Sequence, residues 1–152
     1  MVDIVDTATR SRMMSGIRSK NTKPELFVRK KLFREGFRYR IHVNSLPGKP
    51  DLVFPKYKSI IFVHGCFWHG HQACKLFKVP ATRNEFWINK FAKNRENDTS
   101  VIRQLRDAGW RVAIVWECEI RNKANAENHL IPALSDWIKG NSPIFEIGLS
   151  QP

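Results

Sequence analysis

The stretch Asp51-Leu52-Val53-Phe54-Pro55-Lys56-Tyr57-Lys58-Ser59-Ile60-Ile61-Phe62-Val63 decides the fold that we expect for this chain. It holds two apolar runs, residues 51–54 and 59–63, which are separated by a short turn that contains proline and lysine. Apolar runs of this length, rich in β-branched and aromatic residues, are typical of strands. Because the connection is so short, the sequence predicts an antiparallel hairpin.

Helices are predicted on both sides of this hairpin. Thr22-Lys23-Pro24-Glu25 is a capping-box pattern with an early proline, and Gly36 is a stop signal, so we expect a helix over residues 23–35. A second capping-box pattern, Thr82-Arg83-Asn84-Glu85, predicts a long helix that runs to about residue 108. These two helices would cover the sheet.

Two further strands and a last helix complete the expected order. Residues 39–43 and 110–116 have strand character, and the apolar run 110–116 is expected to be central in the sheet. A helical period over residues 130–138, with Pro132 near its start, predicts the last helix. A long helix before residues 110–116 fits a parallel crossover. The order predicts an α/β fold with a mixed sheet flanked by helices.

Composition limits the class of protein and its partners. The chain has 152 residues, a net charge of +12 and an isoelectric point near 10.1. We expect one domain over residues 21–140, with a basic arm at 1–20 and a tail at 141–152. Such a charge favours nucleic acid over a membrane surface as the partner. No run is apolar enough to span a membrane and no signal peptide is recognisable, so we expect a cytoplasmic protein.

Cysteines and histidines gather directly after the hairpin, in residues 63–74. Cys66, His71 and Cys74 lie close in sequence, and Cys118 follows the expected strand 110–116. If the two strands are parallel neighbours, their carboxyl ends meet, and one structural zinc ion could join all four side chains. On spacing alone His69 could replace His71. The alternative is that the three cysteines are buried and inert.

Groups suited to acid and base chemistry lie at the same edge of the expected sheet. Asp51 follows a Gly- and Pro-containing turn and could bind Mg²⁺ there, although a lone turn aspartate often has no function. The hairpin would bring it near His64, and His69 lies one short loop later; a neutral imidazole is a natural general base. Glu25 is either a capping residue or a functional one. No role is expected for His42 and His129.

Aromatic side chains suggest contact with stacked bases. Phe67 and Trp68 are adjacent and could form a wedge between base steps, or they could pack over the metal loop. Met14 in the basic arm is a candidate second wedge. Trp87, like its neighbour Phe86, is expected to face the core, but it stands early enough in its helix to reach DNA. Lys93 is a further candidate DNA contact.

These motifs together resemble the very-short-patch repair endonucleases of bacteria, the Vsr family, over about residues 6–137. The resemblance is carried by the following stretches: Ala8-Thr9-Arg10-Ser11, Leu46-Pro47-Gly48-Lys49-Pro50-Asp51, Phe62-Val63-His64-Gly65-Cys66-Phe67-Trp68-His69, Leu76-Phe77-Lys78-Val79-Pro80-Ala81-Thr82-Arg83, Glu85-Phe86-Trp87, Gly109-Trp110-Arg111-Val112 and Val115-Trp116-Glu117-Cys118. It implies a restriction-endonuclease-like core and a Mg²⁺-dependent enzyme that nicks duplex DNA 5′ to the thymine of a T:G mismatch. Such mismatches arise when 5-methylcytosine deaminates.

The resemblance also implies a role for individual side chains. The family's catalytic residues fall on Asp51, His64, His69 and Glu25, with Mg²⁺ bound by Asp51 and the main chain of Val63. Its zinc ligands fall on Cys66, His71, Cys74 and Cys118, and its intercalating residues fall on Phe67, Trp68 and Met14. The best-known members have threonine in place of Val63, and the Glu-x-Lys motif of related nucleases is replaced here by Phe62 and His64. A second carboxylate ligand on this strand is therefore missing.

The mechanism that follows has His69 as the general base, His64 positioning the phosphate or the water, and Glu25 orienting a histidine or a water. We expect a monomer that acts near the bacterial nucleoid, with double-stranded DNA and other repair proteins as partners. Two alternatives stay open. One is a nuclease of the same fold that cuts matched DNA, and the other is a zinc-stabilised DNA-binding module without activity.

Overall fold

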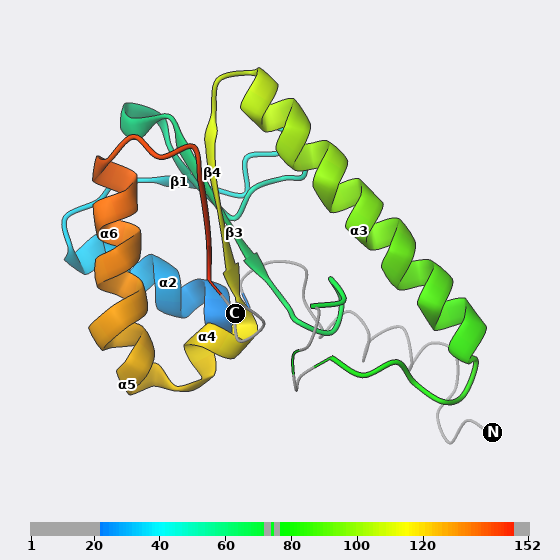
Figure 1. Ribbon diagram of the computed structural model, residues 1–152. Coiled ribbons are helices and arrows are strands. Elements are labelled where there is room, and N and C mark those ends of the chain that lie inside the picture. The colour runs from blue at the N-terminus through cyan, green and yellow to red at the C-terminus, as the bar shows by residue number, and fades with distance from the viewer. Residues whose placement is uncertain (1–21, 72–73, 75–76, 148–152) are drawn as a thin grey trace, which may run out of the picture.

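The computed structural model describes residues 22–71, 74 and 77–147 of the chain, and the basic arm with Met14 lies outside these residues. Figure 1 shows a central sheet with helices on both of its faces. The helices and short helical turns are α2 (Lys23–Arg34), η1 (Pro55–Tyr57), α3 (Asn84–Asp107), α4 (Glu117–Arg121), α5 (Lys123–Asn125), η2 (Ala126–Leu130) and α6 (Ile131–Lys139). The strands are β1 (Arg40–Ile41), β2 (Leu52–Phe54), β3 (Ser59–His64), β4 (Arg111–Trp116) and β5 (Ile144–Ile147).

The sheet is mixed, and its order is β1-β2-β3-β4-β5. Strands β2 and β3 form the predicted antiparallel hairpin, with Leu52 opposite Ile61. Strand β4 runs parallel to β3 after the long helix α3, and His64 pairs with Trp116 at the carboxyl ends of the two strands. The predicted crossover is therefore confirmed, and it brings the two chain segments that follow β3 and β4 to one edge of the sheet.

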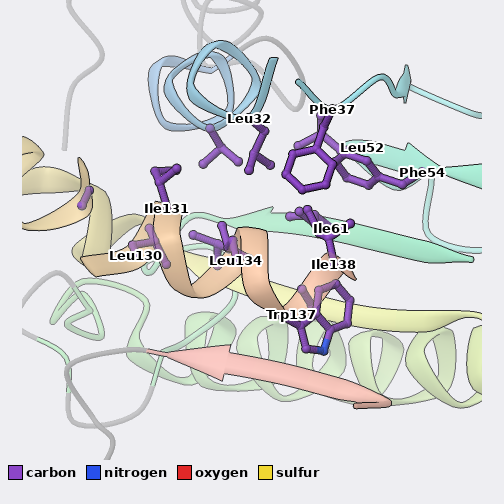
Figure 2. Close-up of a cluster of buried hydrophobic side chains, with 14 of the residues drawn as sticks. Leu32, Phe37, Leu52, Phe54, Ile61, Leu130, Ile131, Leu134, Trp137 and Ile138 are labelled. Carbon is purple, nitrogen blue, oxygen red and sulfur yellow. The ribbon is translucent and has the colours of Figure 1, made fainter. Parts of the chain in front are cut away.

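Alternate residues of the central strands build two cores. On one face, Ile61 and Val115 pack with α2 and α6 through side chains such as Leu32 and Leu134 (Figure 2). On the other face, Ile60, Phe62 and Val112 pack with Leu105 of α3. Strands that are covered on both faces lack polar alternation, which explains the continuous apolar runs of the sequence.

Three details differ from the sequence expectations. The strand predicted over residues 39–43 is short, because His42 takes a left-handed backbone with a φ of 51°. The second capping box is wrong: Arg83 is the N-cap of α3, it is left-handed, and no side chain caps the helix, which leaves Thr82 outside it. Residues 144–147 of the expected tail form β5, which pairs in parallel with β4.

The capping box of α2 is confirmed. The Thr22 hydroxyl accepts from the Glu25 N–H at 3.3 Å, and the Thr22 N–H donates to Glu25 Oε2 at 3.2 Å. None of the helices in the described ranges combines the length and apolar character needed to cross a membrane.

Candidate active site and metal centre

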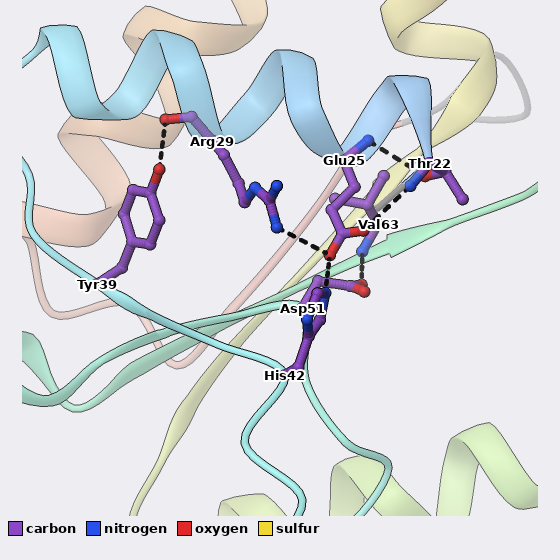
Figure 3. A network of polar contacts seen from close by, with 7 residues as sticks. All are labelled: Thr22, Glu25, Arg29, Tyr39, His42, Asp51 and Val63. Atoms are coloured by element: carbon purple, nitrogen blue, oxygen red, sulfur yellow. Dashed lines mark hydrogen bonds and ion pairs between the residues drawn. The ribbon is translucent and has the colours of Figure 1, made fainter. Parts of the chain in front are cut away.

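Asp51 lies directly beside the end of β3. Its Oδ2 atom accepts a hydrogen bond from the Val63 backbone N–H at 2.6 Å (Figure 3). The hairpin therefore brings these residues together as the sequence predicted. An acceptor held by a backbone donor has a fixed orientation, so the Asp51 carboxylate has a defined position at this edge of the sheet.

Glu25 is a second carboxylate at this place, and it is only 1% exposed. Its Oε1 atom accepts from His42 Nε2 at 2.8 Å and lies 3.9 Å from an Arg29 guanidinium nitrogen (Figure 3). Glu25 thus serves the capping box and also contacts a histidine. That histidine is His42, for which the sequence suggested no role, and the left-handed turn at His42 allows the contact.

The pKa of Asp51 is raised from 3.8 to about 7. Burial is the main cause; the Val63 N–H opposes it, and the negative charge of Glu25 adds to it. Two carboxylates in a partly dehydrated place disfavour each other's charge. A divalent cation bound by oxygen atoms would relieve this repulsion, so the donor set fits Mg²⁺, which prefers oxygen ligands.

His64 and His69 form a stacked pair of imidazoles. Their ring centroids are 3.7 Å apart and the planes differ by 3°. His64 is 6% exposed, and among the described residues its Nδ1 atom has no hydrogen-bond partner. Burial, with a contribution from His69, lowers the pKa of His64 from 6.5 to about 3. His64 is therefore neutral near pH 7.

His69 is oriented by Asp98 of α3. Its Nδ1 atom lies 2.7 Å from Asp98 Oδ2. A carboxylate can only accept, so Nδ1 carries the proton. In the neutral ring the lone pair is then on Nε2, which is the tautomer needed in a general base. The sequence reading missed Asp98. The sequence feature that could have pointed to Asp98 is its spacing: it lies seven residues from each of the buried residues Phe91 and Leu105, and so on the same face of α3.

One cavity of about 240 Å³ joins these groups. Asp51, Val63, His64, His69 and Asp98 all line it. Its walls are completed by Gly48, Lys49, Phe62, Asn97, Val101 and Ile102. The structure therefore gathers the acid and base groups proposed from the sequence into one place, while Glu25 stands behind Asp51.

The cysteine and histidine cluster lies at the same edge of the sheet. One ligand atom each of Cys66, His71, Cys74 and Cys118 lies within 4.8 Å of all the others, and Cys118 Sγ is 3.6 Å from His71 Nδ1. Zinc bound tetrahedrally to sulfur at about 2.3 Å requires ligand atoms roughly 3.8 Å apart. Three soft sulfur donors and one imidazole, all in buried side chains, fit a structural zinc ion. The parallel pairing of β3 and β4 explains why Cys118 reaches the loop.

The geometry separates the two candidate histidine ligands. His71 belongs to the cysteine cluster, whereas His69 faces Asp98. Burial lowers the pKa of His71, and the nearby charge of Glu146 opposes that shift. A second group, formed by His64, His69 and Asp98, also has ligand atoms within 4.8 Å of one another. In that group His69 is hydrogen-bonded to Asp98, and the parallel rings of His64 and His69 are stacked. This arrangement suits ring stacking better than the binding of one metal ion by both histidines.

Comparison with known proteins agrees with this arrangement. Residues 2–75 match the family described as "DNA mismatch endonuclease Vsr". The chain is 45% identical to the DNA mismatch endonuclease Vsr of Escherichia coli (strain K12) over 148 residues, which cover 97% of this chain and 94% of that protein. The chain belongs to the Vsr family.

Other relatives of this Vsr family member are named as nicking enzymes. The type II nicking enzyme V.NmeAIP of Neisseria meningitidis is 47% identical over 91% of this chain and all of its own length. The type II nicking enzyme V.XorIIP of Xanthomonas oryzae pv. oryzae is 43% identical over 86% of this chain and 95% of its own length. Both cover the segment that carries the cavity and the cysteine cluster.

In this Vsr family member α3 holds the loop that carries His69. Asn94 donates to the Trp68 carbonyl oxygen at 2.8 Å, and Arg95 donates twice to the Gly70 carbonyl oxygen, at 2.8 and 3.2 Å. The sequence reading missed both residues, although they stand on the same helix face as Asp98. The loop is therefore attached at each residue from Trp68 to Gly70.

Glycine is favoured at position 70 by the left-handed backbone and by the Arg95 guanidinium close to it. Its φ is +59°, and a Cβ atom there would lie 2.7 Å from Arg95 Nη2. We expect Gly70→Ala to cost about 1–3 kcal/mol of unfolding free energy, measured by urea denaturation, because left-handed strain and displacement of Arg95 add. Gly36→Ala is the matched control, since Gly36 has a φ of +98° but no atom within 4 Å. Equal losses in both variants would refute the contact with Arg95.

An aromatic cluster lies beside this loop. Phe67 contacts Trp68 at 5.1 Å, Trp87 at 5.7 Å and Phe91 at 5.2 Å between ring centroids. Phe67, Trp68 and Trp87 are half-buried, whereas Phe86 is 44% exposed and does not face the core as the sequence suggested. The proposed wedge residues Phe67 and Trp68 are thus partly exposed, and they pack against each other and against α3.

Lys93 lies exposed on α3. Met14 lies outside the described residues, so its proposed contact with DNA stays a prediction.

Proposed function

We propose that this chain nicks double-stranded DNA on the 5′ side of the thymine in a T:G mismatch that arises from deamination of 5-methylcytosine, and so initiates very-short-patch repair. The observation that carries the proposal is the cavity that joins Asp51 with His64 and the His69–Asp98 pair, in a member of the Vsr family. Its catalytic residues would be Asp51, His64 and His69, with Glu25 in a supporting position.

Asp51 and the main-chain carbonyl of Val63 would hold Mg²⁺ in this cavity. A bound Mg²⁺ would supply Lewis-acid chemistry there, by polarising the scissile phosphate and stabilising the leaving oxygen. The raised pKa of Asp51 supports this assignment, because burial disfavours the charged carboxylate and a bound cation would stabilise it. Glu25 has both carboxylate oxygens engaged, with Thr22 and with His42, and so would act by orienting its neighbours.

The protein's own groups would move the proton. His69 Nε2 accepts a proton from the attacking water, and Asp98 keeps Nδ1 protonated and stabilises the imidazolium that forms. His64, which is neutral and lines the same cavity, would position a phosphate oxygen or the water. The stack with His64 and the bond to Asp98 together restrict the orientation of His69.

The mismatch would be found by the aromatic cluster. Phe67 and Trp68, with Met14 from the arm, would insert at the mismatch, while Trp87 and Lys93 contact the duplex; the net charge of +12 supports binding to the phosphate backbone. A structural zinc ion on Cys66, His71, Cys74 and Cys118 would fix the loop that carries both wedge and base.

The remaining expectations belong to this proposal. The mixed sheet with helices on both faces supports a restriction-endonuclease-like core. We further infer action as a monomer on the bacterial chromosome in the cytoplasm, alongside other repair proteins, with the basic arm at 1–20 and a nuclease domain that begins at residue 21 and includes β5.

The test is nicking of labelled duplexes that differ at one base pair, with Mg²⁺ present. We expect a single nick 5′ to the thymine in the T:G duplex and at least about a hundredfold slower reaction on matched T:A and C:G duplexes, because a mismatch unstacks more easily. Varied flanking sequence in the same assay defines the recognition site. Equal cleavage of matched DNA would instead favour a nuclease that acts on matched sites, and no cleavage of any duplex would favour a binding module.

Asp98 provides a second prediction. We expect Asp98→Asn to lower the single-turnover nicking rate by roughly a hundredfold or more, because an amide N–H facing His69 Nδ1 selects the wrong tautomer. DNA binding, measured by fluorescence anisotropy, should stay within about threefold. Asp107→Asn, on the exposed end of the same helix, is the control for loss of one charge. A full rate in Asp98→Asn would remove Asp98 from the mechanism.

A further inference from the structure

Trp116 stands between the proposed zinc cluster and the proposed base. One face of its indole stacks on His71, with ring centroids 3.9 Å apart and planes 4° apart. Its edge-on contacts reach His64 at 5.2 Å and His69 at 6.4 Å, both at 76°. Trp116 is 7% exposed. A single rigid side chain therefore contacts a metal ligand candidate and both active-site histidines.

The indole is held by the last strand of the described chain. Trp116 Nε1 donates to Glu146 Oε2 at 2.8 Å, and Glu146 lies on β5 opposite Ile114 of β4. Glu146 itself is exposed and does not line the cavity that contains Asp51, but with Trp116, His64 and His69 it lines a neighbouring one. Trp116 is the final residue of β4, so its backbone is fixed by the sheet and its ring orientation depends on this hydrogen bond and on stacking.

We propose that Glu146 is a positioning residue, which sets the orientation of Trp116 and thereby aligns His64 and His69 with the zinc-bound His71. This inference rests on the proposed function. It also gives a role to the C-terminal strand, a segment in which the sequence showed no functional signal. The rings form a continuous packed series, so a rotation of the indole must displace the imidazoles on either side.

The physical reason is that a buried indole N–H needs an acceptor. Without the Glu146 carboxylate, the N–H loses a charge-assisted bond and the ring gains freedom to turn toward solvent or another acceptor. A displacement of the order of 1 Å at a base can lower a rate by up to about a hundredfold. Binding of DNA by the basic and aromatic surfaces would be unaffected, since Glu146 belongs to neither.

The experiment compares Glu146→Ala, Glu146→Gln and the control Asp136→Ala, which removes one negative charge from an exposed position on α6. We expect Glu146→Ala to lower the single-turnover nicking rate on a T:G duplex about tenfold with DNA affinity unchanged, because alignment and not binding is lost. Glu146→Gln retains an acceptor oxygen and should recover at least about half of the wild-type rate. Asp136→Ala should match the wild type.

Two readouts do not depend on nuclease activity. Zinc release to a chromogenic chelator should be several-fold faster in Glu146→Ala than in Asp136→Ala, because His71 loses its stacking partner. In ¹H–¹⁵N spectra, the indole N–H signal of Trp116, assigned with Trp116→Phe among the chain's five tryptophans, should shift in Glu146→Ala and return in Glu146→Gln. If wild-type protein nicks no duplex, the proposed function fails while these readouts still decide the positioning role.

A double variant, Trp116→Phe with Glu146→Ala, gives a further test, because it asks whether Glu146 acts through the indole N–H. Trp116→Phe retains a ring but lacks the N–H, so Glu146→Ala should have no further effect on the nicking rate in that background. Additive losses would contradict the proposal. Equal zinc release and equal nicking in Glu146→Ala and Asp136→Ala would also overturn it.

Discussion

Asp51→Asn is expected to lower the rate of T:G nicking by roughly a thousandfold or more, since it removes the charged oxygen ligand proposed for Mg²⁺. Binding of the mismatched duplex, measured by anisotropy in Ca²⁺ or without metal, should be retained, because the wedge and the basic surface are unchanged. Nicking by Asp51→Asn at the wild-type rate would remove Asp51 from the active site.

The same substitution should stabilise the protein in the absence of Mg²⁺. The pKa of Asp51 is 3.8 in an ordinary environment and about 7 in the folded protein. Below about pH 4 the group is protonated in both states, so it carries no penalty. Between these values only the unfolded chain loses the proton, so stability falls as pH rises, and above about pH 7 the full cost of the buried charge remains.

Asp51→Asn removes this cost while its amide oxygen can still accept from Val63. At pH 8 we expect the free energy of unfolding to rise by roughly 1–3 kcal/mol, and the gain should disappear as pH falls toward 4. Urea denaturation in EDTA-free buffer with zinc retained measures this difference. Asp136→Asn, at an exposed site on α6, should show no such pH dependence. A gain that is constant with pH would show that burial of charge is not its cause.

His69→Asn and His71→Asn, two residues apart, should show different defects. His69→Asn should lower nicking by roughly a hundredfold or more through loss of the general base, and it should keep zinc. His71→Asn should lose zinc, because it removes one of the four clustered donors, and nicking should fall with it as the loop loses its support. Metal analysis after dialysis and single-turnover nicking give the two measurements.

The control is His129→Asn, which alters an exposed histidine distant in sequence and should change neither property. The circular dichroism spectra of His69→Asn and His71→Asn should stay close to that of the wild type. The main core between the sheet and helices α2 and α6 includes none of the four proposed zinc ligands. Loss of zinc in His69→Asn with retention in His71→Asn would reverse the assignment of the metal ligand.

Local patterns were sufficient for the hairpin, the capped helix α2, the long helix α3 and the parallel β4. Each depends on neighbours in sequence: a short connection, a capping box, a continuous apolar run. The strand β5 was not predicted, because four residues at a sheet edge carry too little periodicity. The start of α3 was mispredicted because a left-handed Arg83 replaced the expected cap.

In the candidate site, too, some residues could be identified from the sequence and others could not. Asp51, His64 and His69 were identified from residue type and from the edge of one hairpin, and they do line one cavity. Asp98, Asn94 and Arg95 were missed, since they belong to a helix whose relation to the loop depends on packing across the sheet. Spacing left both His69 and His71 open as zinc ligands. The resemblance to the Vsr family favoured His71, and the clustering of His71 with the three cysteines supports that choice.

By itself, the sequence determined the chemical groups and the edge of the sheet at which they meet, because a two-stranded hairpin and a following loop are local structures. Only the tertiary structure decided which partners each group has. His42 meets Glu25, Asp98 meets His69, and Glu146 meets Trp116 across 17, 29 and 30 residues of chain. Such pairs depend on the packing of whole helices and strands, which no local pattern of residues encodes.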